Sequence, residues 1–91
     1  MYKITNYTRE QAKKLNVSVS LSKKKDKKID VIKNDIVIAS VGALGYSDYP
    51  TYIKSHGIEY ANKRRELYKI RHNNDRKIKN SNGYWADKLL W

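Results

Sequence analysis

The sequence has no cysteine, no phenylalanine, one proline and four glycines. Without cysteine the chain can form neither disulfides nor thiolate metal sites, which is compatible with a reducing compartment. All its large rings belong to eight tyrosines and two tryptophans, which carry polar groups that favour the boundary of a core. No stretch approaches the ~18 apolar residues of a membrane span, and residues 1–20 lack the apolar run of a secretory signal. We therefore expect no membrane association and no secretion.

Negative charge is also scarce. Nine Asp and Glu face 20 Lys and Arg, giving a formal net charge of +11. The positive charge lies at both ends, with +7 in residues 1–34 and +5 in residues 58–91, while residues 35–57 carry −1. Such a field attracts phosphate-rich partners and gives salt-sensitive binding. It favours nucleic acid as the partner, with an acidic protein as the alternative.

The hydrophobic pattern predicts one small α+β domain over residues 1–91. Residues 1–41 carry a capping box followed by three short apolar segments with strand patterns, which predict a short helix and a β-meander. The segments are joined by a lysine-rich connection and by a tight Asn34-Asp35 turn, so we expect an antiparallel three-stranded meander. The expected elements are a helix from Thr8 to Leu15 and strands over residues 17–21, 29–33 and 36–41, the last of them central.

Residues 42–91 form a basic and aromatic half that predicts two or three packed helices covering one sheet face. Asp48 or Ser47 can cap a helix that Gly57 ends, and the longest helix is expected over residues 58–72. A helical wheel places Arg64 and Arg71 on its apolar face. A final helical segment is expected to dock through Trp85, Leu89 and Trp91.

Roughly two thirds of the chain is covered by a set of short motifs: KKKDKKIDV, Gly45-Tyr46 with Asp48-Tyr49, the paired Arg64-Arg65, Tyr68, Arg71-His72 and Leu89-Leu90-Trp91. Together these motifs resemble a family of short basic proteins found in large double-stranded DNA viruses and some phages. The resemblance implies a viral origin, DNA more than RNA as the nucleic acid, and a place in the virion or in the host cytoplasm or nucleus, but no established activity.

Two groups of cations and two rings are the candidate nucleic-acid contacts. A lysine-rich hairpin tip can straddle phosphates, and arginines along a helix can bind phosphate oxygens in pairs. Tyr46 and Trp85 lie close after glycines, where a ring on a loop rim can stack on a base. A solvated loop and a small aromatic core are the alternatives for these groups. The candidates are Lys23, Lys24, Lys25, Lys27 and Lys28 in the hairpin, Arg65, Lys69, Arg76 and Lys77 in the helical half, and the rings of Tyr46 and Trp85.

Arg64 and Arg71 have two open interpretations. Each can contact phosphate, or each can be structural, with its guanidinium paired to Asp48 or Asp87 and its stem packed on tyrosines. The phasing of the helix separates them from Arg65 and Lys69, which we expect on an outer basic edge.

Catalytic signals are weak, and we expect no enzyme, no cofactor and no metal. His56 and His72 have no cysteine to support them as metal ligands. The carboxylates show no converging arrangement of the kind that metal-dependent nuclease chemistry needs. The prediction is therefore a nucleic-acid-binding protein without strong sequence preference. The alternatives are a virion structural or interaction protein docking on an acidic viral partner and, more distantly, a small metal-dependent nuclease.

Overall fold

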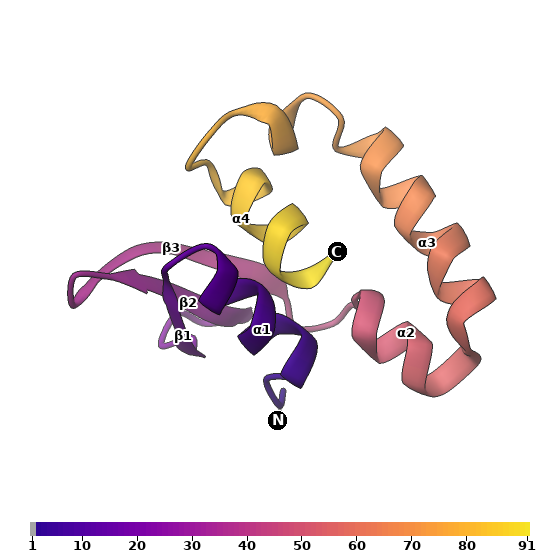
Figure 1. Cartoon of the computed structure of the whole chain (residues 1–91), viewed down its shortest axis with the longest axis horizontal. Coiled ribbons are helices and arrows are strands. Elements are labelled where there is room, and N and C mark those ends of the chain that lie inside the picture. The colour runs from indigo at the N-terminus through magenta and orange to yellow at the C-terminus, as the bar shows by residue number, and fades with distance from the viewer. Residues whose placement is uncertain (1) are drawn as a thin grey trace.

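A computed structural model describes residues 2–91 and shows a small α+β domain, as the sequence predicts. A three-stranded antiparallel sheet follows one helix and precedes the others (Figure 1). Within the described residues, no helix combines the length and apolar character needed to cross a membrane. The elements in order are α1 (Asn6–Lys14), β1 (Ser18–Leu21), β2 (Lys27–Lys33), β3 (Ile36–Ala43), α2 (Tyr49–His56), α3 (Ile58–Arg71), the 3₁₀ turn η1 (Asp75–Lys77) and α4 (Asn82–Leu90).

The sheet is a meander with the strand order β1-β2-β3, so β2 is central. The expectation that residues 36–41 form the central strand was wrong. In β2, Ile29 and Val31 are fully buried, whereas Ile36 and Val37 at the start of β3 are 64% and 52% exposed. A meander places the second strand of the chain in the middle regardless of composition, and here the more apolar run lies at an edge.

The aliphatic core lies between one face of the sheet and the helices α1 and α4. Ile29, Val31 and Val41 of the strands pack with Leu89 and Leu90 of α4. The buried Thr8 hydroxyl of α1 donates a hydrogen bond to the Leu89 carbonyl at 2.8 Å. The two ends of the chain therefore close one core, and Figure 1 shows α4 between the sheet and α3.

Helix α1 begins earlier than the capping box suggests. Thr5, not Thr8, is its N-cap, and the Thr5 hydroxyl accepts a hydrogen bond from the Thr8 amide at 3.2 Å. Thr5 stands three residues before Thr8, so both can cap a helix locally, but the buried contact between Thr8 and Leu89 places Thr8 inside the helix. Tertiary packing thus moves the start of the helix to Thr5, three residues before the capping box.

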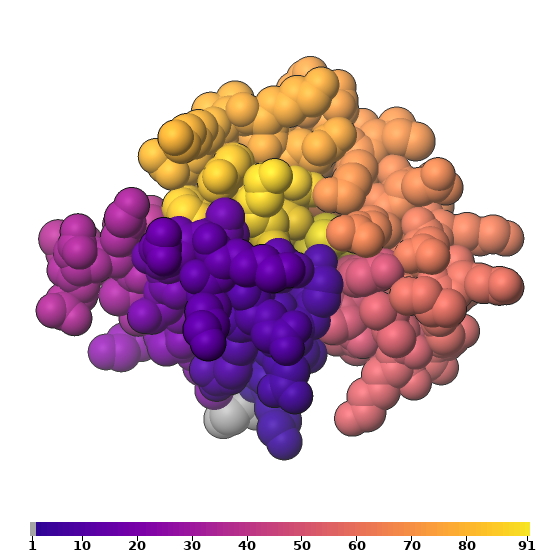
Figure 2. Space-filling model, viewed as in Figure 1, coloured from indigo at the N-terminus to yellow at the C-terminus, as the bar shows by residue number. Residues whose placement is uncertain are grey.

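Helices α2 and α3 form an antiparallel pair beside the sheet and α4 rather than over the sheet. Asp48 caps α2, Pro50 lies in its first turn and Gly57 ends it with φ of 89°, as expected. One contact between this pair and the rest of the protein is made by Trp91, whose ring stacks on Tyr68 with centroids 4.3 Å apart. In Figure 2 the C-terminal residues, in yellow, lie between the indigo N-terminal region and the orange region of α3.

Candidate functional site

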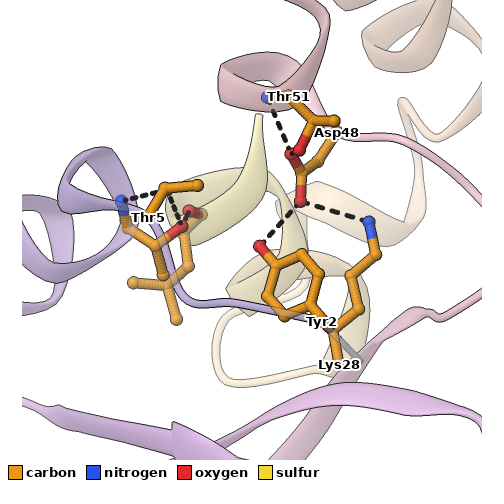
Figure 3. Close-up of polar contacts among 7 residues, drawn as sticks. Tyr2, Thr5, Lys28, Asp48 and Thr51 are labelled. Carbon is orange, nitrogen blue, oxygen red and sulfur yellow. Dashed lines mark hydrogen bonds and ion pairs between the residues drawn. The ribbon is translucent and has the colours of Figure 1, made fainter. Parts of the chain in front are cut away.

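Asp48 is the centre of a buried polar cluster that joins β2, α2 and the N-terminal segment (Figure 3). Its Oδ2 accepts hydrogen bonds from Lys28 Nζ at 3.1 Å and from the Tyr2 hydroxyl at 2.9 Å. Its Oδ1 accepts from the amide and hydroxyl of Thr51, at 3.1 and 2.6 Å. Burial and the Asp48 carboxylate raise the pKa of Tyr2, which stays protonated as a donor.

Lys28 is therefore not available to a phosphate. Its side chain is only 4% exposed and its ammonium pairs with Asp48. We expected Lys28 in the hairpin tip, but it lies inside β2, the second residue of the strand. A buried carboxylate needs a compensating cation, and Lys28 supplies it.

A second ion pair joins α3 to α4. Lys69 Nζ donates to Asp87 Oδ1 at 2.6 Å, and the Asp87 side chain is 4% exposed. Lys69 was expected on an outer basic edge, and that expectation was wrong. Asp48 and Asp87 both form ion pairs, but with lysines in place of the expected arginines. Within the described chain, Arg64 and Arg71 form no ion pair.

Arg64 and Arg65 both lie over tyrosine rings. The Arg64 guanidinium is 5.5 Å from the centroid of Tyr52, and that of Arg65 is 4.4 Å from the centroid of Tyr49. Both arginines are half-buried, and neither Nε finds a hydrogen-bond partner in residues 2–91. Arg65 is thus a packing residue between α3 and α2 rather than part of an outer edge, and cation–π attraction replaces the acid that Arg64 was expected to find.

The two candidate stacking rings have opposite environments. Trp85 is 5% exposed and belongs to the core, so the prediction that it stacks on a base was wrong. The cause is local, since Ser81 caps α4 and the helix starts at Asn82, which turns Trp85 toward the sheet. Tyr46 lies in the loop after β3 and is 76% exposed.

The connection between β1 and β2 exposes three lysines on a fixed backbone. We call Lys23, Lys24 and Lys25 the lysine turn; all three are exposed. Asp30 anchors it, accepting from the Ser22 hydroxyl at 2.6 Å and from the Lys23 amide at 3.2 Å. Burial raises the pKa of Asp30, but hydrogen bonds from Ser22, Ser40 and the Lys23 amide outweigh it, so the pKa is lowered. The backbone is held while the three ammonium groups stay in solvent.

A cleft of about 500 Å³ opens between the end of the sheet, α3 and α4. Rings of Tyr68 and Trp91 lie along it, and Arg64, Tyr68 and Arg71 face it from α3 at spacings of four and three residues. These three residues share one helix face. We refer to this hollow as the cleft. The residues that line it include Lys27, Lys28, Tyr46, Tyr52, Arg64, Tyr68, Arg71, His72, Asp75, Asn82 and Trp91.

Positive charge dominates the cleft. Arg71 is exposed, and Lys27 is half-buried. Among the described residues, Asp75 is the one side-chain carboxylate that lines the cleft, and His72 Nδ1 lies 3.3 Å from its Oδ2. A negatively charged ligand with a flat ring would meet cations and aromatic surfaces here together.

The lysine turn and the cleft lie at the same end of the sheet. Lys27 pairs with Ala43, and the Leu44 amide donates to the Asp26 carbonyl at 3.1 Å. The turn therefore lies against the loop that leads to Tyr46. The remaining candidates lie after α3, where Arg76 donates from Nε to the Lys69 carbonyl at 3.2 Å and Lys77 is exposed. Arg76 thus covers the C-terminal end of α3, while Lys77 stays free for contact.

The cleft itself was not predicted from the sequence. The shared face of Arg64, Tyr68 and Arg71 was visible in the spacing, but its neighbours were taken to be acids. The aromatic partner is Trp91, which comes from the far end of the chain. The periodicity of α3 could not identify Trp91 as the partner. It also could not predict that His72 and Asp75, which follow the helix, line the cleft.

Comparison of the chain with protein-family models, with curated proteins and with solved structures gave no match. The resemblance to short basic viral proteins stays a prediction. Within residues 2–91, no three His, Asp or Glu side chains are grouped to hold a metal ion.

Proposed function

We propose that the protein binds nucleic acid without strong sequence preference, through the lysine turn and the cations of the cleft. The observation that carries this proposal is the scarcity of internal charge pairing. Of the 20 lysines and arginines, only Lys28 and Lys69 form ion pairs within residues 2–91. Arg64 and Arg65 lie over tyrosine rings and Arg76 bonds to a backbone carbonyl, but most of the others are exposed to solvent. Phosphate is the partner that such a surface favours.

The arrangement supports backbone contacts better than base recognition in a groove. Lysine ammonium groups on the turn act as point charges, while Arg71 can bind two phosphate oxygens with its planar fork. Phosphate contacts position a protein on nucleic acid and carry no sequence information. The turn and the cleft adjoin, so one strand can contact both.

Salt dependence tests the proposal. If about five phosphates are neutralised, affinity for duplex DNA should fall roughly 500-fold between ~50 and ~200 mM salt, because the logarithm of the binding constant falls by ~0.9 per phosphate for each decade of salt. We would measure it by fluorescence anisotropy with a labelled duplex of about 20 base pairs.

A matched pair of triple variants locates the contacts. Replacing Lys23, Lys24 and Lys25 with Ala should lower the salt slope by up to ~2.7, at ~0.9 per lost contact. The control replaces three exposed lysines of other elements, Lys33, Lys54 and Lys63, and removes the same charge. Equal slopes in the two variants would show that only net charge matters. Absence of binding by the unmodified protein at ~50 mM salt would overturn the proposal.

A further inference from the structure

We propose that the cleft holds one unpaired nucleotide, with its base against Tyr46 and its phosphate at Arg71 and Arg64, so that the protein prefers single strands to duplex. This inference rests on the proposed function and specifies the form of nucleic acid that it selects. Its basis is the meeting of an open aromatic face, unpaired guanidinium groups and a hollow of suitable size at one place.

The size and the rings of the cleft suit a nucleotide. Its volume of about 500 Å³ lies within the ~300–1,000 Å³ of small-ligand sites. Tyr68 and Trp91 stack on each other and form a wall. Tyr46, by contrast, is paired with no other ring or cation in the described chain and is 76% exposed. Its face is free to receive a base.

The two arginines that line the same cleft have no acidic partner within residues 2–91. Arg71 is exposed and makes no ion pair or side-chain hydrogen bond within residues 2–91, and Arg64 Nε is buried there without an acceptor. The two arginines are seven residues apart on one helix face, or about 10 Å along the axis at 1.5 Å per residue. A phosphate bound here would satisfy the exposed guanidinium donors of Arg71, which the described residues leave without a partner.

The polar groups of the cleft explain why base identity would matter little. The Asn82 amide lines the hollow and can both donate and accept, so it suits the edge of any base. Asp75, the carboxylate on the wall, is engaged by His72. In a duplex the base faces are covered by their neighbours and the edges are paired, so Tyr46 could not stack. Unpaired nucleotides alone can use the cleft fully.

The test compares a labelled single strand of about 20 nucleotides with its duplex at ~100 mM salt. The unmodified protein should bind the single strand more tightly. Tyr46→Ala should weaken single-strand binding about 10-fold and duplex binding little, because stacking on an aromatic ring contributes ~1–3 kcal/mol per base. Tyr46→Phe should keep the preference. Tyr46 is exposed, so these changes leave the core intact.

Arg71→Ala should also weaken single-strand binding, beyond the effect of the control Lys13→Ala, which removes one exposed charge from α1, outside the cleft. Equal affinity for strand and duplex, with Tyr46→Ala without effect on either, would overturn the cleft assignment and leave the proposed function standing. Absence of binding to both would overturn the two together. Tight binding of a free nucleoside monophosphate, matching that of the strand, would also overturn it, since the cleft would then serve a small molecule.

Discussion

Removing the Asp48 carboxylate should be among the most destabilising single changes in this protein. Asp48 is fully buried and holds Lys28, Tyr2 and Thr51 together. In Asp48→Ala the Lys28 ammonium would remain buried with no carboxylate, and α2 would lose its cap. The charge left behind, rather than the loss of one hydrogen bond, sets the size of the effect.

The magnitude follows from the two losses. Breaking a buried pair by removing one partner costs ~3–5 kcal/mol, and losing an N-cap costs ~1 kcal/mol, with some overlap because both use one side chain. We expect about 4 kcal/mol, against a total of roughly 5–14 kcal/mol for 91 residues. At ~4–8 °C per kcal/mol, the melting temperature should fall by roughly 16–32 °C.

Urea denaturation followed by tryptophan fluorescence would measure the loss. Asp48→Asn keeps an oxygen acceptor for Thr51 but removes the charge, so it distinguishes the loss of the N-cap from the loss of the ion pair with Lys28. Glu66→Ala is the control for the loss of an exposed carboxylate. The double variant Asp48→Ala with Lys28→Met should recover much of the stability, because it removes the stranded charge as well. A free energy of unfolding of Asp48→Ala within ~0.5 kcal/mol of that of the unmodified protein would contradict this prediction. So would a double variant that is no more stable than Asp48→Ala.

Two further predictions concern packing and pH. Gly42→Ala should lower the free energy of unfolding by about 1–3 kcal/mol, because φ is +84° and a Cβ would lie 2.8 Å from Leu90 Cδ1. The control Gly45→Ala, whose Cβ would have no heavy atom within 4 Å, should change stability little. Equal denaturation midpoints of the two variants would contradict this. Burial, Asp87 and Asp75 raise the pKa of Tyr68 from 10.0 to about 12. The unfolded chain therefore loses this proton first, so stability should fall between pH 10 and about 12, and less steeply in Tyr68→Phe; identical slopes in a pH series would refute it.

Local signals in the sequence predicted the elements well. The helix expected over residues 58–72 spans Ile58–Arg71, Asp48 caps α2 and Gly57 ends it. Caps, breakers and periodicity act within a few residues, so the sequence displays them directly. The central strand was misassigned because the apolar run 36–41 has the composition of a buried strand, whereas the short connections of the predicted meander already place the second strand in the middle.

The partners of charged groups could not be predicted in the same way. Helical phasing gave the direction of Arg64 and Arg71 but not the surface opposite them, which depends on how distant segments meet. Asp48 forms its ion pair with Lys28, and Asp87 forms its ion pair with Lys69. As a result, two expected phosphate contacts became structural, while Arg64 and Arg71 line the cleft without an acidic partner within residues 2–91.

The aliphatic core contains no residue of α2 or α3. Asp48 ties the start of α2 to β2, whereas α3 is held to α4 and Trp91 by the Tyr68–Trp91 stack and the Lys69–Asp87 pair. In terms of cooperative units, we expect α3 to open at a lower free energy than the sheet with α1 and α4. The wall of the cleft that carries Arg64 and Arg71 belongs to the less stable unit, so the width of the cleft can change without unfolding the protein.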